Sequence, residues 1–234
     1  MKLNVLSPCH PKKTERRPSP TDRDLSRIEA AYDAVAGDYA REFRGEHEKK
    51  PMDQEMLGRF AKAIGGEGPV LDLGCGPGQT SGYLHGLGLK VMGMDLSGKA
   101  IAEAGKAHPD IEFRKGDMLE LDLPDSSVAG IVSFYAIVHF SPAQVETAFR
   151  EICRVLRPGG RLLLTFHVGD ETIHLEEYLG HRIDVDFMFF ATGFISRALQ
   201  HAGLEVTEII ERDPYPGVEY QSRRAYVWAR KAEE

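Results

Sequence analysis

A glycine-rich segment directly after a short apolar strand constrains the fold of this chain more than any other feature. The predicted strand, residues 70–73, reads Val-Leu-Asp-Leu and is bounded by a proline and a glycine. Such a run fits a strand buried in a parallel sheet better than an alternating surface strand. Gly74, Gly76 and Gly78 follow at once, and a helix is predicted to open after them. Glycines at this place let the backbone come close to a ligand, so the turn predicts a binding site.

Strand and helix patterns alternate after this turn. Further strands are predicted over residues 89–94, 111–115, 128–134, 161–166, 204–211 and 224–230. Helices are predicted over residues 100–107, 143–156 and 195–202, with Pro158, Gly159 and Gly160 breaking the second of them. This rhythm indicates parallel βαβ units. We therefore expect an α/β fold with a doubly wound, seven-stranded, mostly parallel sheet and helices on both faces.

The segments outside this alternation divide the chain. Apolar residues at helical spacing on both sides of Pro51 predict an N-terminal helical cap over about residues 22–66. Residues 168–192 are rich in acidic, histidine and aromatic side chains, and we expect a substrate lid there because ligands bind outside the carboxyl ends of the strands in such sheets. Residues 1–21, basic and proline-rich without the apolar run of a secretory signal, are expected to be a disordered tail.

Composition limits the classes of partner. A formal net charge of -7 argues against a nucleic-acid backbone as the main partner, and no window approaches the roughly 18 apolar residues of a membrane span. Cys9, Cys75 and Cys153 are scattered, which fits a reducing cytoplasmic compartment and no metal site. We expect a soluble, cytoplasmic monomer or homodimer that binds a small molecule.

Two acidic residues end neighbouring strands. Asp95 lies about twenty residues beyond the glycine turn, where a carboxylate can accept hydrogen bonds from two ribose hydroxyls. Asp117 follows the third strand and can accept from an exocyclic amine such as that of adenine, although it can also be read as a helix N-cap. Together they indicate a nucleoside ligand.

The glycine turn departs from the dinucleotide fingerprint. Its spacing is G-x-G-x-G with Pro77 inside, and Gln79 occupies the position of the third dinucleotide glycine. An NAD-dependent oxidoreductase would share the fold class and Asp95, so it remains an alternative. A turn needed only for tight packing is another.

Four ordered motifs resemble those of class I S-adenosylmethionine-dependent methyltransferases. They are residues 70–78 (Val-Leu-Asp-Leu-Gly-Cys-Gly-Pro-Gly), the strand-ending Asp95, Gly116-Asp117-Met118, and residues 156–162 (Leu-Arg-Pro-Gly-Gly-Arg-Leu). The resemblance implies a Rossmann-like methyltransferase domain over residues 22–234 with an antiparallel last strand. It also implies methyl transfer from S-adenosylmethionine to an O or N atom of a small molecule. A non-catalytic module that binds S-adenosylmethionine is the alternative.

The resemblance also implies which residues contact the cofactor and its product, S-adenosylhomocysteine. The glycines would line the methionine and ribose portions, Asp72 would orient the methionine end, and Asp117 would hold adenine. Two tyrosines come from a Tyr-Asp-x-x-Ala-x-x-Tyr pattern that closes over the cofactor in similar enzymes, or that simply packs its helix onto the domain. The full set is Tyr32, Tyr39, Asp72, Gly74, Cys75, Gly76, Gly78, Gln79, Asp95, Leu96, Asp117, Met118 and Phe134.

Histidines are the candidates for proton transfer. Displacement from a sulfonium depends mainly on alignment, and a base adds a typical ~100- to 10,000-fold only when the nucleophile carries a proton. His139, after the fourth strand, is the first candidate base, and His167, after the fifth, is the second. Glu171, His174 and His181 would join His167 in a polar pocket, if they are not exposed.

The acceptor is only partly constrained by the sequence. Neither the Asn-Pro-Pro-Tyr motif of nucleobase amino methylation nor a carboxylate cluster for magnesium is present. An apolar or aromatic acceptor is favoured by the aromatic residues of the predicted lid, unless they cap the core: Tyr178, Phe187, Phe189 and Phe190. Four arginines are candidates for pairing with an acceptor carboxylate: Arg182, Arg197, Arg223 and Arg224.

Overall fold

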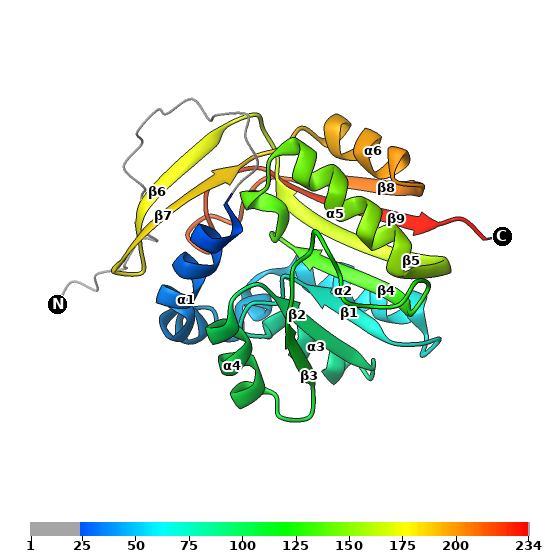
Figure 1. The fold of residues 1–234 in the computed structure, drawn as a ribbon, viewed down its shortest axis with the longest axis horizontal. Coiled ribbons are helices and arrows are strands. Elements are labelled where there is room, and N and C mark those ends of the chain that lie inside the picture. Colours follow the sequence, from blue (N-terminus) through cyan, green and yellow to red (C-terminus); the bar gives the residue numbers. More distant parts are fainter. Residues whose placement is uncertain (1–23, 234) are drawn as a thin grey trace.

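The computed structural model describes residues 24–233, so the predicted tail over residues 1–21 lies outside the described residues. A seven-stranded sheet forms the centre of the molecule (Figure 1). Its strands, in spatial order, are β3 (Glu112–Lys115), β2 (Val91–Asp95), β1 (Val70–Leu73), β4 (Val128–Phe134), β5 (Leu156–His167), β9 (Arg224–Lys231) and β8 (Leu204–Arg212).

Helices cover both faces of this sheet, as the alternation of the sequence predicted. The α-helices are α1 (Leu25–Glu42), α2 (Pro51–Ile64), α3 (Gln79–Gly86), α4 (Gly98–Ala107), α5 (Pro142–Val155) and α6 (Thr192–His201). Two short 3₁₀ helices, η1 (Glu46–Lys49) and η2 (Ile137–His139), lie between them. Helix α5 begins with a capping box formed by Ser141 and Gln144 and has a proline at its start, which accounts for its well-defined beginning.

The direction of the last strand separates this sheet from a dinucleotide-binding one. Strands β1 to β5 pair in parallel, whereas β9 is antiparallel to both β5 and β8. The dinucleotide-binding sheet has six parallel strands in the order 3-2-1-4-5-6. The expected antiparallel last strand is therefore confirmed, and the topology counts against the oxidoreductase alternative.

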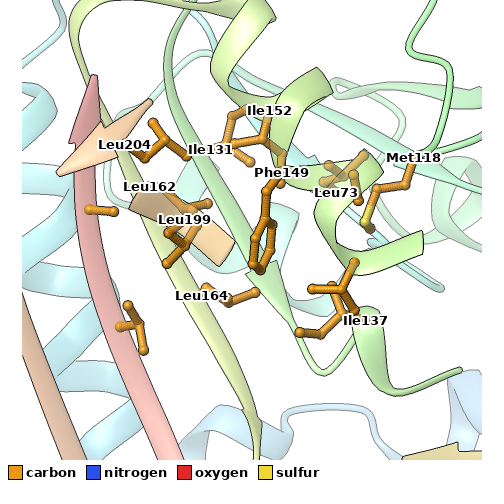
Figure 2. Close-up of a cluster of buried hydrophobic side chains, with 14 of the residues drawn as sticks. Leu73, Met118, Ile131, Ile137, Phe149, Ile152, Leu162, Leu164, Leu199 and Leu204 are labelled. Carbon is orange, nitrogen blue, oxygen red and sulfur yellow. The ribbon is translucent and has the colours of Figure 1, made fainter. Parts of the chain in front are cut away.

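Successive residues of the central strands point into two separate hydrophobic cores, one on each face of the sheet. Leu162 and Leu164 of β5 point toward α5 and α6, where they pack with Phe149 and Leu199 (Figure 2). Leu163 points to the opposite face, into the cluster that contains the buried residues of α2. This alternation is the two-residue period of a strand, and it explains why the strands read as continuous apolar runs.

The region over residues 168–192 contains a β-hairpin that the sequence analysis did not predict. Strands β6 (Thr172–Tyr178) and β7 (His181–Met188) pair antiparallel in a sheet of their own. The hairpin extends beyond the main sheet and lies beside α1 (Figure 1). Salt bridges join these two elements, from Arg27 to Asp184 and from Asp38 to His181.

One strand begins several residues earlier than expected. Strand β5 begins at Leu156, before the Pro-Gly-Gly segment, because Leu156 already pairs with Val128 of β4. The buried face of helix α2 packs on the sheet. In the described part of the chain no helix is long and apolar enough to cross a membrane.

Candidate functional site

A cavity of about 660 Å³ opens at the carboxyl ends of β1, β2 and β4, between α1, η1 and the hairpin. This volume lies within the roughly 300–1,000 Å³ of small-molecule sites. The sequence analysis named thirteen cofactor contacts, and all of them line the cavity except Gly78. Both candidate catalytic histidines line it as well.

The glycine turn forms one wall through left-handed backbone conformations. Gly74 and Gly76 have φ angles of 77° and 52°. A Cβ at Gly74 would lie 2.2 Å from the Cβ of Ala136, whereas a Cβ at Gly76 would meet nothing within 4 Å. Gly76 therefore leaves open space beside the turn, where a ligand can approach the backbone. Gly78 has a different role, since its α-carbon packs against Phe113 where α3 begins.

Two aspartates flank this turn, Asp72 buried and Asp95 partly buried. Asp95 accepts backbone hydrogen bonds from Gly76 and Ser97, each 2.8 Å long, and burial raises its pKa. Asp72 accepts a 2.6 Å hydrogen bond from the Ser81 hydroxyl, and burial raises its pKa to about 7. The Asp95 contacts fix the carboxylate at the end of β2, where its remaining lone pairs border the cavity.

Two further polar groups complete this side of the cavity. Asp117 accepts a 2.8 Å hydrogen bond from the Leu119 backbone N–H, and no helix follows it, so the helix N-cap interpretation is wrong. The side-chain nitrogen of Gln79 is buried and has no hydrogen-bond partner. An orphaned buried donor of this kind is matched by a ligand that carries acceptor atoms.

Helix α1 closes the cavity through a hydrogen-bonded chain. His139 donates from Nδ1 to the backbone carbonyl of Asp186, over 2.8 Å, because a carbonyl can only accept. In the neutral ring Nε2 is then an acceptor, so it receives the Tyr32 hydroxyl proton over 2.7 Å. Burial raises the pKa of Tyr32 and keeps this phenol protonated. His139 thus connects η2 to both α1 and β7, and its Nε2 lone pair faces Tyr32 instead of open space.

His167 lies in a different environment. It stacks on Phe189, with ring centroids 5.0 Å apart, and its Nδ1 lies 2.7 Å from the Ser222 hydroxyl oxygen. Burial and the positive charges of Arg224 and Lys50 lower its pKa to about 3. This imidazole is therefore neutral at physiological pH and weakly basic.

The neutral state of His167 makes the folded protein sensitive to acid. The unfolded chain binds a proton at this ring below about pH 6.5, whereas the folded chain does so only near pH 3. The contribution of this group to the free energy of unfolding is therefore lost as the pH falls below 6.5, by up to roughly 1.4 kcal/mol for each pH unit. We expect urea titrations to show that the free energy of unfolding falls less between pH 7 and pH 4.5 for His167→Phe than for the wild type. The exposed-site control His201→Phe should keep the wild-type loss, and an equal loss in all three proteins would contradict the assignment.

The remaining polar candidates are not brought together. Neither Glu171, His174 nor His181 lines the cavity, because His174 pairs with Asp186 and His181 pairs with Asp38. The polar pocket expected from these three residues and His167 is therefore wrong. Of the aromatic candidates, Phe190 packs with Phe194 in the core, while the other three line the cavity. Of the four arginines, only Arg224 lines it.

Several cavity residues were missed by sequence reasoning. Lys50 and Asp53 come from the start of α2, and Glu219 comes from the loop between β8 and β9. Tyr135 directly follows β4 in a left-handed conformation, with φ of 55°, which is uncommon for a non-glycine residue. No local motif unites these positions, which lie far apart in the chain. Within residues 24–233 no three metal-ligating side chains converge on a common point.

Comparisons with known proteins identify the central segment. Residues 70–160 match the family described as a methyltransferase domain. Over 110 residues the chain is 36% identical to a probable S-adenosylmethionine-dependent methyltransferase of Mycolicibacterium smegmatis, covering 44% of this chain and 42% of that protein. Over 141 residues it is 33% identical to the uncharacterized methyltransferase YcgJ of Bacillus subtilis, covering 57% and 55% respectively. The chain thus spans about half the length of these relatives.

Solved structures agree on the fold. A complex of DhpI with SAH superposes with a TM-score of 0.66 at 21% sequence identity, covering 90% of this chain and 98% of that one. The likeness covers more of the chain than residues 70–160, which the family model matches.

Proposed function

We propose that this chain transfers a methyl group from S-adenosylmethionine to an O or N atom of a small-molecule acceptor. The proposal follows because the chain belongs to the class I S-adenosylmethionine-dependent methyltransferase family. The observation that carries the proposal is the wall built from the glycine turn and Asp95. It combines open space at Gly76, a fixed carboxylate and an orphaned donor at Gln79 on one side of a single cavity.

The residues present fit this cofactor. Asp95 would accept from the ribose hydroxyls, and Asp117 would accept from the adenine amine beside Met118. Burial raises the pKa of Asp72 to about 7, and the positive charge of the cofactor's ammonium group would lower it again, so that Asp72 is ionised when the cofactor is bound. S-adenosylmethionine, when bound, supplies a sulfonium methyl group that is open to in-line attack.

Helix α1 and residues 168–192 are proposed to act together as a lid. The Tyr32–His139–Asp186 chain and the Arg27–Asp184 pair support this role, because each of them links α1 to β7, directly or through η2. A closed lid would exclude water and align the acceptor with the methyl group. Opening it would require Tyr32 to leave His139.

Neither candidate histidine offers a strong base in this arrangement. The Nε2 lone pair of His139 accepts from Tyr32, and His167 has a strongly lowered pKa. We therefore propose that His139 acts as a positioning residue. The acceptor atom would then be one that is already deprotonated or that loses its proton after attack.

Turnover with a labelled methyl donor tests this function. The protein is incubated with S-adenosylmethionine carrying a tritiated methyl group and, in separate reactions, with the small-molecule, protein and nucleic-acid fractions of a cell extract. We expect label in small molecules, formation of S-adenosylhomocysteine, and neither with Asp95→Ala. Tight cofactor binding without transfer to any fraction would favour the non-catalytic module, and label only in protein or nucleic acid would contradict a small-molecule acceptor.

A further inference from the structure

Orphaned polar atoms occur where η1, the start of α2, the end of β4 and the start of β9 border the cavity. They are Nδ1 of His47, Oδ2 of Asp53, the hydroxyl of Tyr135 and Nε of Arg224, and all four residues line the cavity. The atoms of His47 and Asp53 lie 3.6 Å apart, and the Arg224 guanidinium lies 5.7 Å from the centre of the Tyr135 ring. Because buried polar atoms nearly always have partners, this grouping indicates a place for a polar ligand group.

Arg224 is a buried cation whose Nε has no hydrogen-bond partner. The residue is 3% exposed, and its Nη1 donates to the backbone carbonyls of Tyr220 and Ser222. Its Nε lies 3.1 Å from Glu219 without hydrogen-bond geometry. Glu219 instead accepts from both terminal nitrogens of Arg212, whose Nη2 also lies 3.7 Å from Asp53. A buried cation in this state favours a further anionic partner.

Lys50 supplies a second cation at the same place. Its Nζ donates over 2.5 Å to Glu46, which leaves two N–H donors for another acceptor. Lys50 and Arg224 both act on the His167 ring, and with burial they lower its pKa. Asp53 also borders the cavity and accepts a hydrogen bond from the Tyr226 hydroxyl. The field beside His167 is therefore positive.

The cavity also has aromatic walls. Phe187 and Phe189 of the hairpin region line it, with Phe189 stacked on His167 and Phe187 edge-on to His139 at 4.4 Å between ring centroids. Tyr178 lines the cavity and lies 6.2 Å from Tyr39, measured between ring centroids. Aromatic walls of this kind bind apolar, ring-sized bodies.

We propose that the methyl acceptor is a small carboxylic acid with an apolar body, and that Arg224, Lys50 and the Tyr135 hydroxyl bind its carboxylate. The identification of this ligand as the acceptor rests on the proposed function, whereas the carboxylate site itself does not. The carboxylate supplies acceptors to the two orphaned donors, Arg224 Nε and the Tyr135 hydroxyl, and the aromatic hairpin residues contact the body.

Calorimetry with matched acid and amide pairs tests the site. The probes are benzoate, phenylacetate, 3-phenylpropionate and 4-phenylbutyrate, each compared with its primary amide, on protein saturated with S-adenosylhomocysteine. Charge-assisted hydrogen bonds are roughly twice as strong as neutral ones, so at least one acid should bind about 10-fold or more tightly than its amide. Equal affinities for every pair, or no binding of any acid, would overturn the proposal.

Variants locate the site. Arg224→Gln should remove the preference for the acid, while the control Arg223→Gln should keep it, because Arg223 is exposed and pairs with Glu211 outside the cavity. Tyr135→Phe is a second variant that should fold normally, since it removes only a hydroxyl that has no hydrogen-bond partner. It should weaken acid binding several-fold, weaken amide binding less, and not lower the melting temperature of the free protein.

The two proposals fail in different ways. If S-adenosylhomocysteine does not bind but the acids bind with the same dependence on Arg224, the carboxylate site stands and the methyltransferase assignment fails. If S-adenosylhomocysteine binds and no acid is preferred over its amide, the cofactor assignment stands and the carboxylate site fails. An acid preference that persists in Arg224→Gln would also contradict the site.

Discussion

Replacement of Asp95 by alanine is expected to weaken binding of S-adenosylhomocysteine by about 100-fold or more. The variant could no longer accept hydrogen bonds from the ribose hydroxyls. Ligand hydroxyls that are buried without a partner cost much of the binding free energy. The change also frees the backbone N–H groups of Gly76 and Ser97, which the carboxylate now holds in place. The glycine turn would therefore lose its fixed geometry as well as its ligand contact.

Calorimetric titration measures this loss, and circular dichroism shows that the variant remains folded. Asp110→Ala is the matched control, because Asp110 is exposed and does not line the cavity. It should bind S-adenosylhomocysteine as the wild type does. Wild-type affinity in a folded Asp95→Ala protein would mean that Asp95 does not contact the nucleoside.

Replacement of Gly74 by alanine is expected to lower the free energy of unfolding by about 3 kcal/mol or more. Two effects add. The φ angle of 77° is strained for any residue with a Cβ, and the new atom would lie 2.2 Å from the Cβ of Ala136. Ala136 is part of the segment after β4 that leads into η2, so relief of the clash would move the segment that carries His139.

Urea denaturation measures the change, and Gly105→Ala provides a matched control. Gly105 lies inside α4, is exposed, and has nothing within 4 Å of its added Cβ. The same substitution there should stabilise the protein by about 0.5–1 kcal/mol, because alanine favours a helix. Equal effects at the two glycines would contradict the account of the turn.

The parallel half of the fold was well predicted because its signals are local. Strands β1 and β4 have the bounds expected from sequence, since each is a continuous apolar run between breaking residues. The hairpin was missed for an equally local reason. Its two-residue turn has positive φ angles at Leu179 and Gly180, and leucine replaces the asparagine or aspartate that normally signals such a turn.

The candidate site was predicted unevenly. The residues of the glycine turn and Asp95 carry a motif with fixed spacing, so sequence reasoning placed them beside one cavity. Lys50 and Arg224 both come near His167 because α2 packs on the sheet and β9 pairs within it, and no spacing pattern in the sequence predicts this. The partners of His139 also depend on tertiary structure, which is why it was predicted as a base before its bond to Tyr32 was seen.

The central claim is that the cavity binds S-adenosylmethionine, and calorimetric titration of the wild-type protein tests it most directly. The ligands are S-adenosylmethionine, S-adenosylhomocysteine and, for comparison, NAD. The account predicts micromolar or tighter binding of the first two and no measurable binding of NAD. Absence of binding for the first two, or binding of NAD alone, would contradict it.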